Sequence, residues 1–401
     1  MTSRAPFVFI ILTVAIDAIG IGLILPVMPE LIRELRGASI SDAAFWGGWL
    51  AFTYAVMQFL CGPLLGGLSD RFGRRPVLIL SLVLLGIDYL LMAVAPALWM
   101  LFLARFLAGA AGATHATAAA YLADISDKGK RSANFGLIGA AFGIGFTLGP
   151  AIGGLLGELG PRAPFYAAAA LALGNAAFGW RVLPESLPPE RRARFELARA
   201  NPFRALLDAS RLPMVGGLLL VHFLYVVSNY VYPAIWSFFT IERFGWSTGM
   251  VGLSLAAFGV SSAFVQGWLI RRLLPRLGEF RTAMFGLAMH VLALVILAVI
   301  EDGIWIFVFM PITALGVVVG PALQGMMADR VPDDAQGRLQ GVLASVAAVA
   351  VILSPVVMTG IFRLATLPDG PVYLPGAPFL AAAALAAVCA LLLMRGRKAA
   401  A

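Results

Sequence analysis

The chain of 401 residues is 61% hydrophobic and 12% charged, and it carries a formal net charge of +8 at pH 7. Soluble proteins are about 45–50% apolar and about 25% charged, so a fold in water could not cover this much apolar surface. The composition therefore excludes soluble enzymes, disordered chains and disulfide scaffolds, and it predicts a membrane protein.

Apolar runs of the length that a bilayer-spanning helix needs, about 20 residues, follow one another along the chain. They cover 7–32, 44–68, 77–95, 98–123, 135–157, 163–183, 212–240, 248–270, 282–300, 304–328, 339–363 and 377–394. The runs are continuous, whereas the strands of a membrane β-barrel would alternate polar and apolar residues. We therefore predict an all-α polytopic membrane protein with twelve transmembrane helices.

The positions of Lys and Arg predict the orientation. All but six of the 29 basic residues fall on one side if the N-terminus is cytoplasmic; five fall on the other side, and Arg105 lies within a span. Cytoplasmic loops carry this excess because of the positive-inside rule. The net charge therefore reflects topology and the anionic lipids of the inner leaflet, and no nucleic-acid partner is expected.

The longest connection, 184–211, is basic and divides the spans six and six. It separates an N-terminal bundle, 1–183, from a C-terminal bundle, 212–401. The two halves match at a constant offset of 205 residues in four pairs: Gly73 and Gly278, Asp124 and Asp329, Gly136 and Gly341, and Pro150 and Pro355. Such a parallel repeat predicts two six-helix bundles related by a pseudo-two-fold axis, with a transported substrate bound near the midplane.

Two motifs suggest moving parts. In the loop 66–76, Gly73 permits a tight turn, and Asp70 and Arg74 supply opposite charges that could form a breakable latch. Basic residues in this loop could also simply follow the topology. In the fifth span, Gly145, Gly149, Gly153 and Gly157 form a stripe of small residues and Pro150 bends the helix, so this span could serve close packing, movement or both.

Polar residues inside apolar runs are costly and by default mark a pathway. The ionisable ones are Asp17, Asp88, Arg105, His115, His222 and His290, and Gln58 and Gln266 add neutral polar groups. In the seventh span, one helical face carries His222, Tyr225, Asn229, Tyr232 and Trp236. This face suits a flat organic substrate, although its side chains could also hold helices together.

Other function classes lack their motifs. The chain has no phosphate-binding loop and no zinc-protease motif, so we expect no enzyme, no ATP-driven pump, no cofactor and no metal site. A proton-coupled importer of a small solute would share the architecture and stays the alternative to an exporter.

Over its whole length the chain resembles the tetracycline–proton antiporters of the major facilitator superfamily. The resemblance rests on Asp17–Leu23 with Pro26, Tyr54–Gln58, the loop Gly67–Pro76, Ile87–Tyr89, Arg105 with Gly109, Gly149–Pro150 and Gln336–Gly341. It implies export of an amphipathic drug by a multi-pass protein of the bacterial inner membrane. We also expect a monomer, and the positions of the basic residues predict that both termini are cytoplasmic. Asp17, Asp88 and Arg105 would be essential membrane charges and Gln58 a substrate contact. Asp70 and Arg74 would form the gate, to which we add Asp124, Gly149 and Pro150.

The chain also departs from this family. Ser262 stands where members that export tetracycline have a histidine in the eighth span, and His290 stands where they have an aspartate in the ninth. His115 replaces a usual glycine in the fourth span. These departures leave fewer negative charges for a cationic cargo. The residues that we expect to bind the substrate are Gln58, His115, His222, Tyr225, Asn229, Trp236, Ser262 and Gln266.

Proton coupling needs a group that gains and loses a proton during the cycle. Asp17 and Asp88 are the expected carboxylate carriers, and His290 is the candidate in the C-terminal half because imidazole titrates near neutral pH. Arg105 does not deprotonate, so it is expected to keep a carboxylate ionised or to displace its proton.

Overall fold

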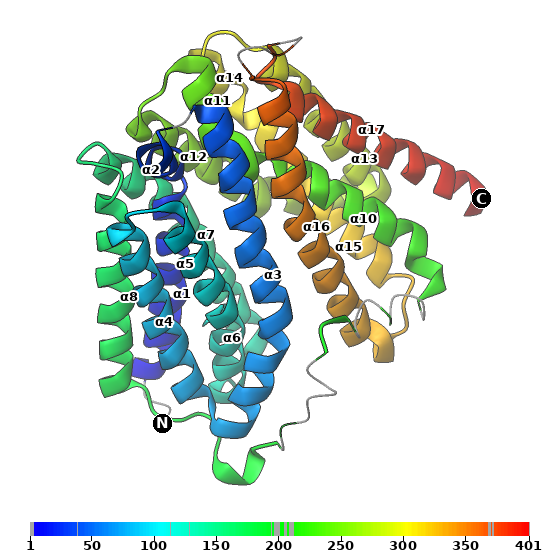
Figure 1. Cartoon of the computed structure of the whole chain (residues 1–401). Coiled ribbons are helices and arrows are strands. Elements are labelled where there is room, and N and C mark those ends of the chain that lie inside the picture. Colours follow the sequence, from blue (N-terminus) through cyan, green and yellow to red (C-terminus); the bar gives the residue numbers. More distant parts are fainter. Residues whose placement is uncertain are drawn as a thin grey trace. The chain divides into compact units, whose positions relative to one another are not determined.

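The computed structural model describes residues 4–400 apart from 38, 113, 128, 194, 196–200, 204–206, 208–211, 368–369 and 371–372. Its first part consists of α1 (Arg4–Ile24), α2 (Met28–Arg36), α3 (Ile40–Phe72), α4 (Arg74–Val94), α5 (Leu98–Ala111), α6 (Thr114–Ile125), α7 (Arg131–Gly157) and α8 (Ala163–Val182). The second part consists of α10 (Gly216–Asn229), α11 (Val231–Phe244), α12 (Thr248–Phe264), α13 (Ile270–Val299), α14 (Ile304–Leu315), α15 (Val319–Ala328), α16 (Gln336–Leu364) and α17 (Ala377–Ala400). The helices appear in Figure 1, and the described residues include no β-strand.

Within the described part of the chain, ten helical segments are long and apolar enough to cross a membrane. One of them, 248–299, contains two predicted spans, because Gly278 interrupts the helix with a φ of 71°. The apolar 20-residue helix α8 accounts for the remaining span. The predicted all-α polytopic fold class is therefore confirmed. The first span is shorter than predicted: α1 ends at Ile24, and Pro26, which lacks a backbone N–H, lies in the turn before α2.

The repeat that relates the two halves also appears in the backbone. Gly73 and Gly278 both adopt a left-handed φ, of 107° and 71°, which only glycine adopts freely. The fourth span of each half is also interrupted at the corresponding place. In the first half the break lies between α5 and α6, and in the second half a 3₁₀ turn at Gly316–Val318 separates α14 from α15. In the first span of each half, α1 ends at Ile24 and α10 ends at Asn229.

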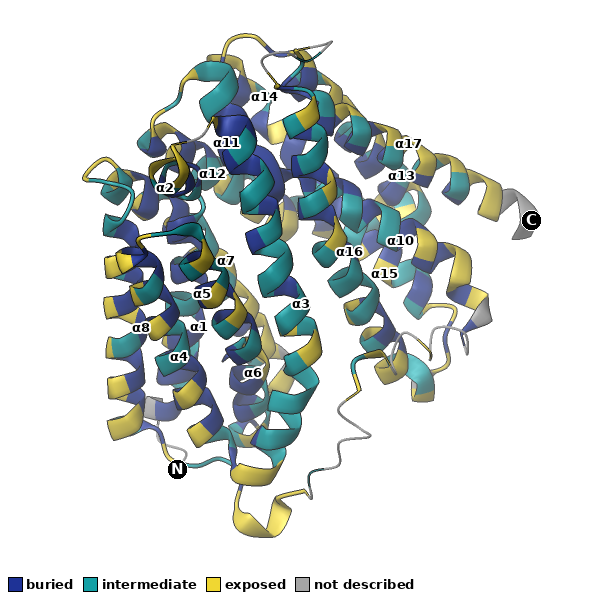
Figure 2. Ribbon diagram, in the orientation of Figure 1, coloured by how far each residue is buried: buried dark blue, intermediate teal, exposed yellow. Residues whose placement is uncertain are grey.

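The outer faces of the helices carry exposed apolar side chains. Along α8, Tyr166, Leu171, Phe178 and Trp180 are 40% to 67% exposed, and Figure 2 shows exposed residues at intervals along this helix. Large exposed apolar faces are rare in soluble monomers, whereas they are what acyl chains contact. This surface agrees with a multi-pass membrane protein.

The described contacts divide the chain into two compact units. Unit 1 comprises residues 1–38, 53–202 and 247–256, and unit 2 comprises residues 39–52, 203–246 and 257–401. The beginning of α3 thus packs within unit 2, and the beginning of α12 packs within unit 1. The bundles 1–183 and 212–401 stay a prediction, and much of the linker 184–211 lies outside the described residues.

In unit 1, the glycine stripe of α7 packs directly on the backbone of α1. A Cβ atom at Gly145, Gly149 or Gly153 would collide with the carbonyl oxygen of Ala15, Ile19 or Leu23 respectively. The four-residue spacing therefore brings two helix backbones together, as small residues do in membranes. The packing interpretation of this stripe accounts for these contacts.

A further contact holds the beginning of α12 against the end of α7. The Glu158 carboxylate accepts a hydrogen bond of 2.8 Å from the backbone N–H of Gly249. Hydrogen bonds from the Ser247 side chain and from this N–H lower the pKa of Glu158. Because the folded-state pKa is lowered, the stabilisation is present above the ordinary carboxyl pKa and is lost as the pH falls through the folded-state value.

Gly149→Ala is expected to destabilise the protein strongly, because the new methyl group would meet the Ile19 carbonyl oxygen at 2.6 Å, in a backbone contact that cannot move aside. Gly143→Ala is the matched control on the same helix, since no described atom lies within 4 Å of its Cβ position. The measurement is thermal unfolding of both purified variants in detergent. Equal melting temperatures would contradict the close packing of α1 and α7.

Candidate functional site

A buried ion pair forms the centre of the polar cluster in unit 1. The guanidinium of Arg105, on α5, donates to the carboxylate of Asp88, on α4. Asp88 is fully buried and Arg105 is 7% exposed. Asp88 Oδ1 and Arg105 Nε are buried without a hydrogen-bond partner among the described residues. Such a pair is costly to desolvate and gives weak evidence for stability, so its presence in an apolar helix pair points to function.

Asp17, on α1, belongs to the same neighbourhood. The charges of Asp17, Asp88 and Arg105 all act on the Tyr89 side chain, and the Tyr89 hydroxyl lies beside Gly20, one turn after Asp17 on α1. The structure therefore brings together the three membrane charges of the N-terminal half, although they come from three helices.

Gln58 joins this cluster through Tyr54, its neighbour one turn earlier on α3. The Arg105 guanidinium carbon lies 5.6 Å from the centre of the Tyr54 ring, a cation–π distance. The Gln58 amide donates to the Tyr54 hydroxyl at 3.3 Å and to the Gly112 carbonyl at 3.5 Å. That carbonyl is freed by the break between α5 and α6, where an interrupted helix can meet a substrate. His115, on α6, instead packs edge-on against Phe142.

Unit 2 contains an aromatic cluster rather than an ion pair. The Tyr225 and Tyr232 rings lie 5.7 and 5.9 Å from the ring of His290, and Trp236 packs on Tyr232 and on Phe379 of α17. The tyrosines and Trp236 are at most 8% exposed. The helix is interrupted at Tyr230, but Tyr225 before the interruption and Tyr232 after it both contact the ring of His290. Helix–helix packing accounts for these contacts, and a substrate wall stays a prediction.

His290, on α13, is fully buried and held by Ser228 of α10. The Ser228 hydroxyl has one proton, which it donates to the Ala382 carbonyl at 2.7 Å. Ser228 must therefore accept from His290 Nε2, at 3.0 Å, and this assigns the neutral ring its proton on Nε2. Nδ1 is then an acceptor without a partner in the described part of the chain.

The other predicted substrate contacts of unit 2 do not converge on His290 through any described hydrogen bond. Ser262 and His222 are buried, and Ser262 Oγ and His222 Nδ1 lack hydrogen-bond partners among the residues that the structure describes. Asn229 is half-buried, at the end of α10. Gln266 is exposed and lies in a single π-helical turn, Val265–Leu269, a feature that is frequent at functional sites.

The predicted latch forms at the end of α3 in unit 1. Arg74 pairs with Asp70 at 2.5 Å and with Asp124 of α6 at 3.3 Å. The Asp124 carboxylate also accepts from the Ser186 hydroxyl at 3.1 Å. One guanidinium thus joins three segments, and the predicted gate residues Asp70, Arg74 and Asp124 lie together. Pro150 and Gly149 lie elsewhere, in the contact of α7 with α1.

Glu185 completes this network, and the sequence analysis missed it. Its carboxylate accepts from the backbone N–H groups of Arg74 and Arg75 at 2.8 and 3.3 Å, which stabilises the first turn of α4. A Cβ at Gly73 would collide with this carboxylate, so the glycine is needed for its contact as well as for its φ. The only sequence signal was an acidic residue directly after the sixth span.

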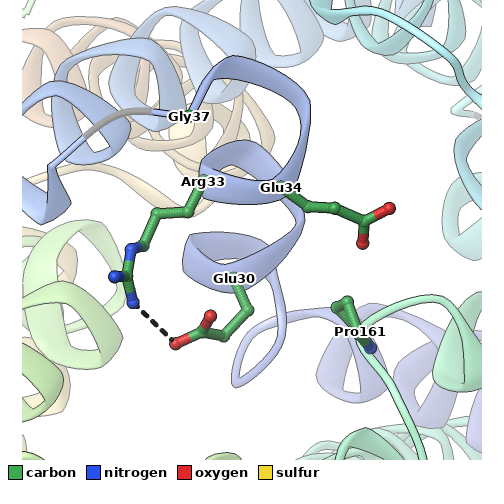
Figure 3. A pocket seen from close by; sticks show the side chains of 5 residues that line it. All are labelled: Glu30, Arg33, Glu34, Gly37 and Pro161. Atoms are coloured by element: carbon green, nitrogen blue, oxygen red, sulfur yellow. Dashed lines mark hydrogen bonds and ion pairs between the residues drawn. The ribbon is translucent and has the colours of Figure 1, made fainter.

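The open pocket of Figure 3 is a different feature. It has a volume of about 480 Å³ and is lined by Glu30, Arg33, Glu34, Gly37 and Pro161, in unit 1. Arg33 pairs with Glu30 at 3.2 Å, and Glu34 pairs with Arg162 at 3.0 Å. None of the predicted site residues lines this pocket.

The comparisons with known proteins agree with this fold. Residues 10–355 match the family model of the Major Facilitator Superfamily. The chain is 41% identical to the tetracycline resistance protein, class C, of Escherichia coli over 99% of this chain and 98% of that protein. It is 40% identical to the class G protein of Vibrio anguillarum, over 90% and 91%.

A solved structure is also similar. The human organic anion transporter MFSD10 (TETRAN) matches with a TM-score of 0.70 and 26% identity, and the match covers 98% of this chain and all of that one. These relatives are membrane transporters, and their likeness extends over nearly the whole chain. The chain therefore belongs to the tetracycline resistance proteins of the major facilitator superfamily.

Proposed function

We propose that this protein exports tetracycline-like compounds from the cytoplasm in exchange for protons. The observation that carries the proposal is the buried pair of Asp88 and Arg105, with Asp17 in the same electrostatic neighbourhood. A carboxylate that must exchange protons inside the membrane needs a partner that holds its charged form, and Arg105 does so because it stays protonated. The high identity to tetracycline resistance proteins supports the cargo class.

The finer features of the proposal follow from the topology. The excess of basic residues in alternate loops supports a bacterial inner-membrane protein with both termini in the cytoplasm. The exposed apolar faces of α8 and its neighbours suit lipid contacts. We propose a monomer, with protons and a small organic molecule as its partners and without enzymatic activity.

The C-terminal half supports a cargo with less positive charge than a metal–tetracycline complex. His290 occupies the place of an acidic residue in the resembling exporters, and its described surroundings are the Tyr225 and Tyr232 rings and the Ser228 hydroxyl. Aromatic rings with polar edges favour flat organic molecules. His290 can accept one proton on its free Nδ1, so it stays a candidate for proton coupling.

Transport by reconstituted protein tests the proposal. Proteoliposomes with an imposed pH gradient are supplied with tetracycline, a planar cationic dye or a lipophilic cation, and the accumulation of each is measured. We expect accumulation of tetracycline that collapses when the proton gradient is dissipated. Equal accumulation with and without a gradient, or none for any tetracycline, would contradict the proposed function.

Asp70→Asn is expected to reduce turnover severalfold while substrate binding stays near the wild-type level. The reason is that Asp70 pairs with Arg74 at the end of α3, whereas the membrane charges lie in the interior of α1, α4 and α5. Transport rate and equilibrium tetracycline binding are measured on the same preparation. Arg33→Gln is the control, since it removes an exposed ion pair with Glu30. Wild-type turnover of Asp70→Asn would remove Asp70 from the gate.

A further inference from the structure

The repeat places His222 in the C-terminal half where Asp17 lies in the N-terminal half. The sequence offset that relates Gly73 to Gly278, both with left-handed φ, also relates Asp17 to His222. The helix ends agree with this pairing: Asp17 lies seven residues before the end of α1 at Ile24, and His222 lies seven residues before the end of α10 at Asn229. Two turns before the break of the first span, each half therefore carries a titratable side chain.

The other two membrane charges have no counterpart. The same offset places Ala293 at the position of Asp88 and Met310 at the position of Arg105. Of the three charged positions in the N-terminal half, only that of Asp17 keeps a titratable residue in the second half. A merely structural role would not explain why this position is polar in both halves, since the other two positions are apolar in the second half.

The surroundings of His222 leave its ring free to accept a proton. The side chain is 5% exposed, and Nδ1 is buried without a hydrogen-bond partner among the described residues. The helices that pack on α10 are α11, α15, α16 and α17, and α13 contacts it through His290, which meets Ser228 and Tyr225. The titratable groups in these helices are Tyr232, Glu242 and Arg243 on α11, Arg338 and Arg363 near the ends of α16, Cys389 with the terminal Arg395, Arg397 and Lys398 on α17, and Arg271, Arg272, Arg276, Glu279, Arg281 and His290 on α13, with none on α15.

Two titratable groups lie near His222 along the helices. The Cys389 thiol donates to the carbonyl of Val221, the preceding residue, at 3.6 Å. Tyr225 lies one turn further on α10, and its hydroxyl donates to the Gly316 carbonyl. Neither group carries a charge at neutral pH. The imidazole therefore has no fixed ion partner among these groups, which is the opposite of the arrangement of Asp88 with Arg105.

His290 differs from His222 in this respect. Its Nε2–H donates to the Ser228 hydroxyl, which in turn donates to the Ala382 carbonyl. Its ring also contacts the rings of Tyr225 and Tyr232. An added proton could bind only Nδ1. This nitrogen lies close to Gly316, since a Cβ atom added to that glycine would lie 3.1 Å from Nδ1. No described hydrogen bond fixes the ring of His222 in this way.

We infer that His222 is the proton-exchange residue of the C-terminal repeat, taking the part that Asp17 has in the N-terminal repeat. The inference rests on the proposed proton-coupled export. In the step concerned, the unprotonated ring nitrogen of neutral His222 forms an N–H bond with a proton taken from water on one side of the membrane. That bond later breaks and returns the proton to water on the other side. Protonation of Asp17 removes a negative charge, whereas protonation of His222 creates a positive one, and either change disfavours a cationic cargo.

The test compares four variants in proteoliposomes: His222→Gln, His222→Asp, His290→Gln and Cys389→Ser. The rate of gradient-driven tetracycline uptake is measured from about pH 5 to 8, the range of imidazole titration. Protons moved per tetracycline are recorded with a pH-sensitive dye. Exchange of labelled for unlabelled tetracycline without a gradient reports whether each variant folds and binds.

In His222→Gln we expect gradient-driven uptake to fall about tenfold relative to the variant's own tetracycline exchange, with a flat pH profile and fewer protons moved per tetracycline, because glutamine cannot take up a proton. His222→Asp restores coupling with a shifted pH profile, and it also shows that the site tolerates substitution. Cys389→Ser, in the same helix contact, keeps the wild-type profile.

An unchanged pH profile and an unchanged proton count in His222→Gln would overturn the inference, as would loss of coupling in His290→Gln alone. In both cases the wild-type protein still couples tetracycline to protons, so the proposed function stands. Wild-type protein that moves tetracycline without protons would overturn both.

Discussion

Asp88→Asn is expected to abolish proton-driven accumulation and to lower the stability of the protein. The asparagine cannot exchange a proton, and it leaves the 7%-exposed Arg105 guanidinium without its carboxylate. Removing one partner of a buried ion pair costs about 3–5 kcal/mol. The measurements are gradient-driven tetracycline uptake and thermal unfolding in detergent.

The double variant Asp88→Asn with Arg105→Gln separates the two effects. It removes both charges, so we expect it to regain much of the thermal stability that the single variant lost, because no unpaired charge stays buried. Uptake driven by the gradient should stay absent. Recovery of transport together with stability would show that the pair serves only folding, and that the proton carrier lies elsewhere.

Asp17→Asn is expected to abolish coupling with little loss of stability. Asp17 is half-buried and forms no described ion pair, so the amide replaces the carboxyl group at nearly the same size. The variant should still exchange labelled for unlabelled tetracycline but should not accumulate it against a gradient. Both rates are measured in the same proteoliposomes.

Asp17→Glu is the control, because it keeps a titratable carboxyl group. We expect it to retain part of the gradient-driven uptake, with a different pH dependence. If Asp17→Asn accumulates tetracycline with the wild-type pH dependence, the carboxyl group of Asp17 is structural.

The fold could be predicted from the sequence because a lipid bilayer leaves the backbone few alternatives to the helix. Each predicted apolar run is mostly helical in the described part of the chain, because backbone N–H and C=O groups must pair within the segment in a bilayer. The repeat pair of Gly73 and Gly278 also predicted where the backbone turns, and both residues show a left-handed φ. The sequence analysis missed the local break at Tyr230, although Pro233 marks it, because this proline has no N–H to donate to the carbonyl of Asn229 four residues earlier.

Most residues of the candidate site could be proposed from the sequence, but their contacts could not. The cost of burying charge identified Asp88 and Arg105, and only the structure showed that they pair. Glu185 was missed because it lies 111 residues from Arg74 in sequence, and no periodicity links a loop carboxylate to a distant helix start. The aromatic face of the seventh span was ambiguous for the same reason, since packing against Phe379 depends on α17.

The direction of proton movement during substrate flow tests the central claim most directly. Proteoliposomes at equal internal and external pH receive external tetracycline, and a dye follows the pH of the medium as the drug enters down its own gradient. Exchange of drug for protons predicts that the medium becomes more acidic as protons leave the lumen, and that Asp17→Asn abolishes this signal. A medium that becomes more alkaline would show that protons enter with the drug, and the protein would then be an importer of the symporter type.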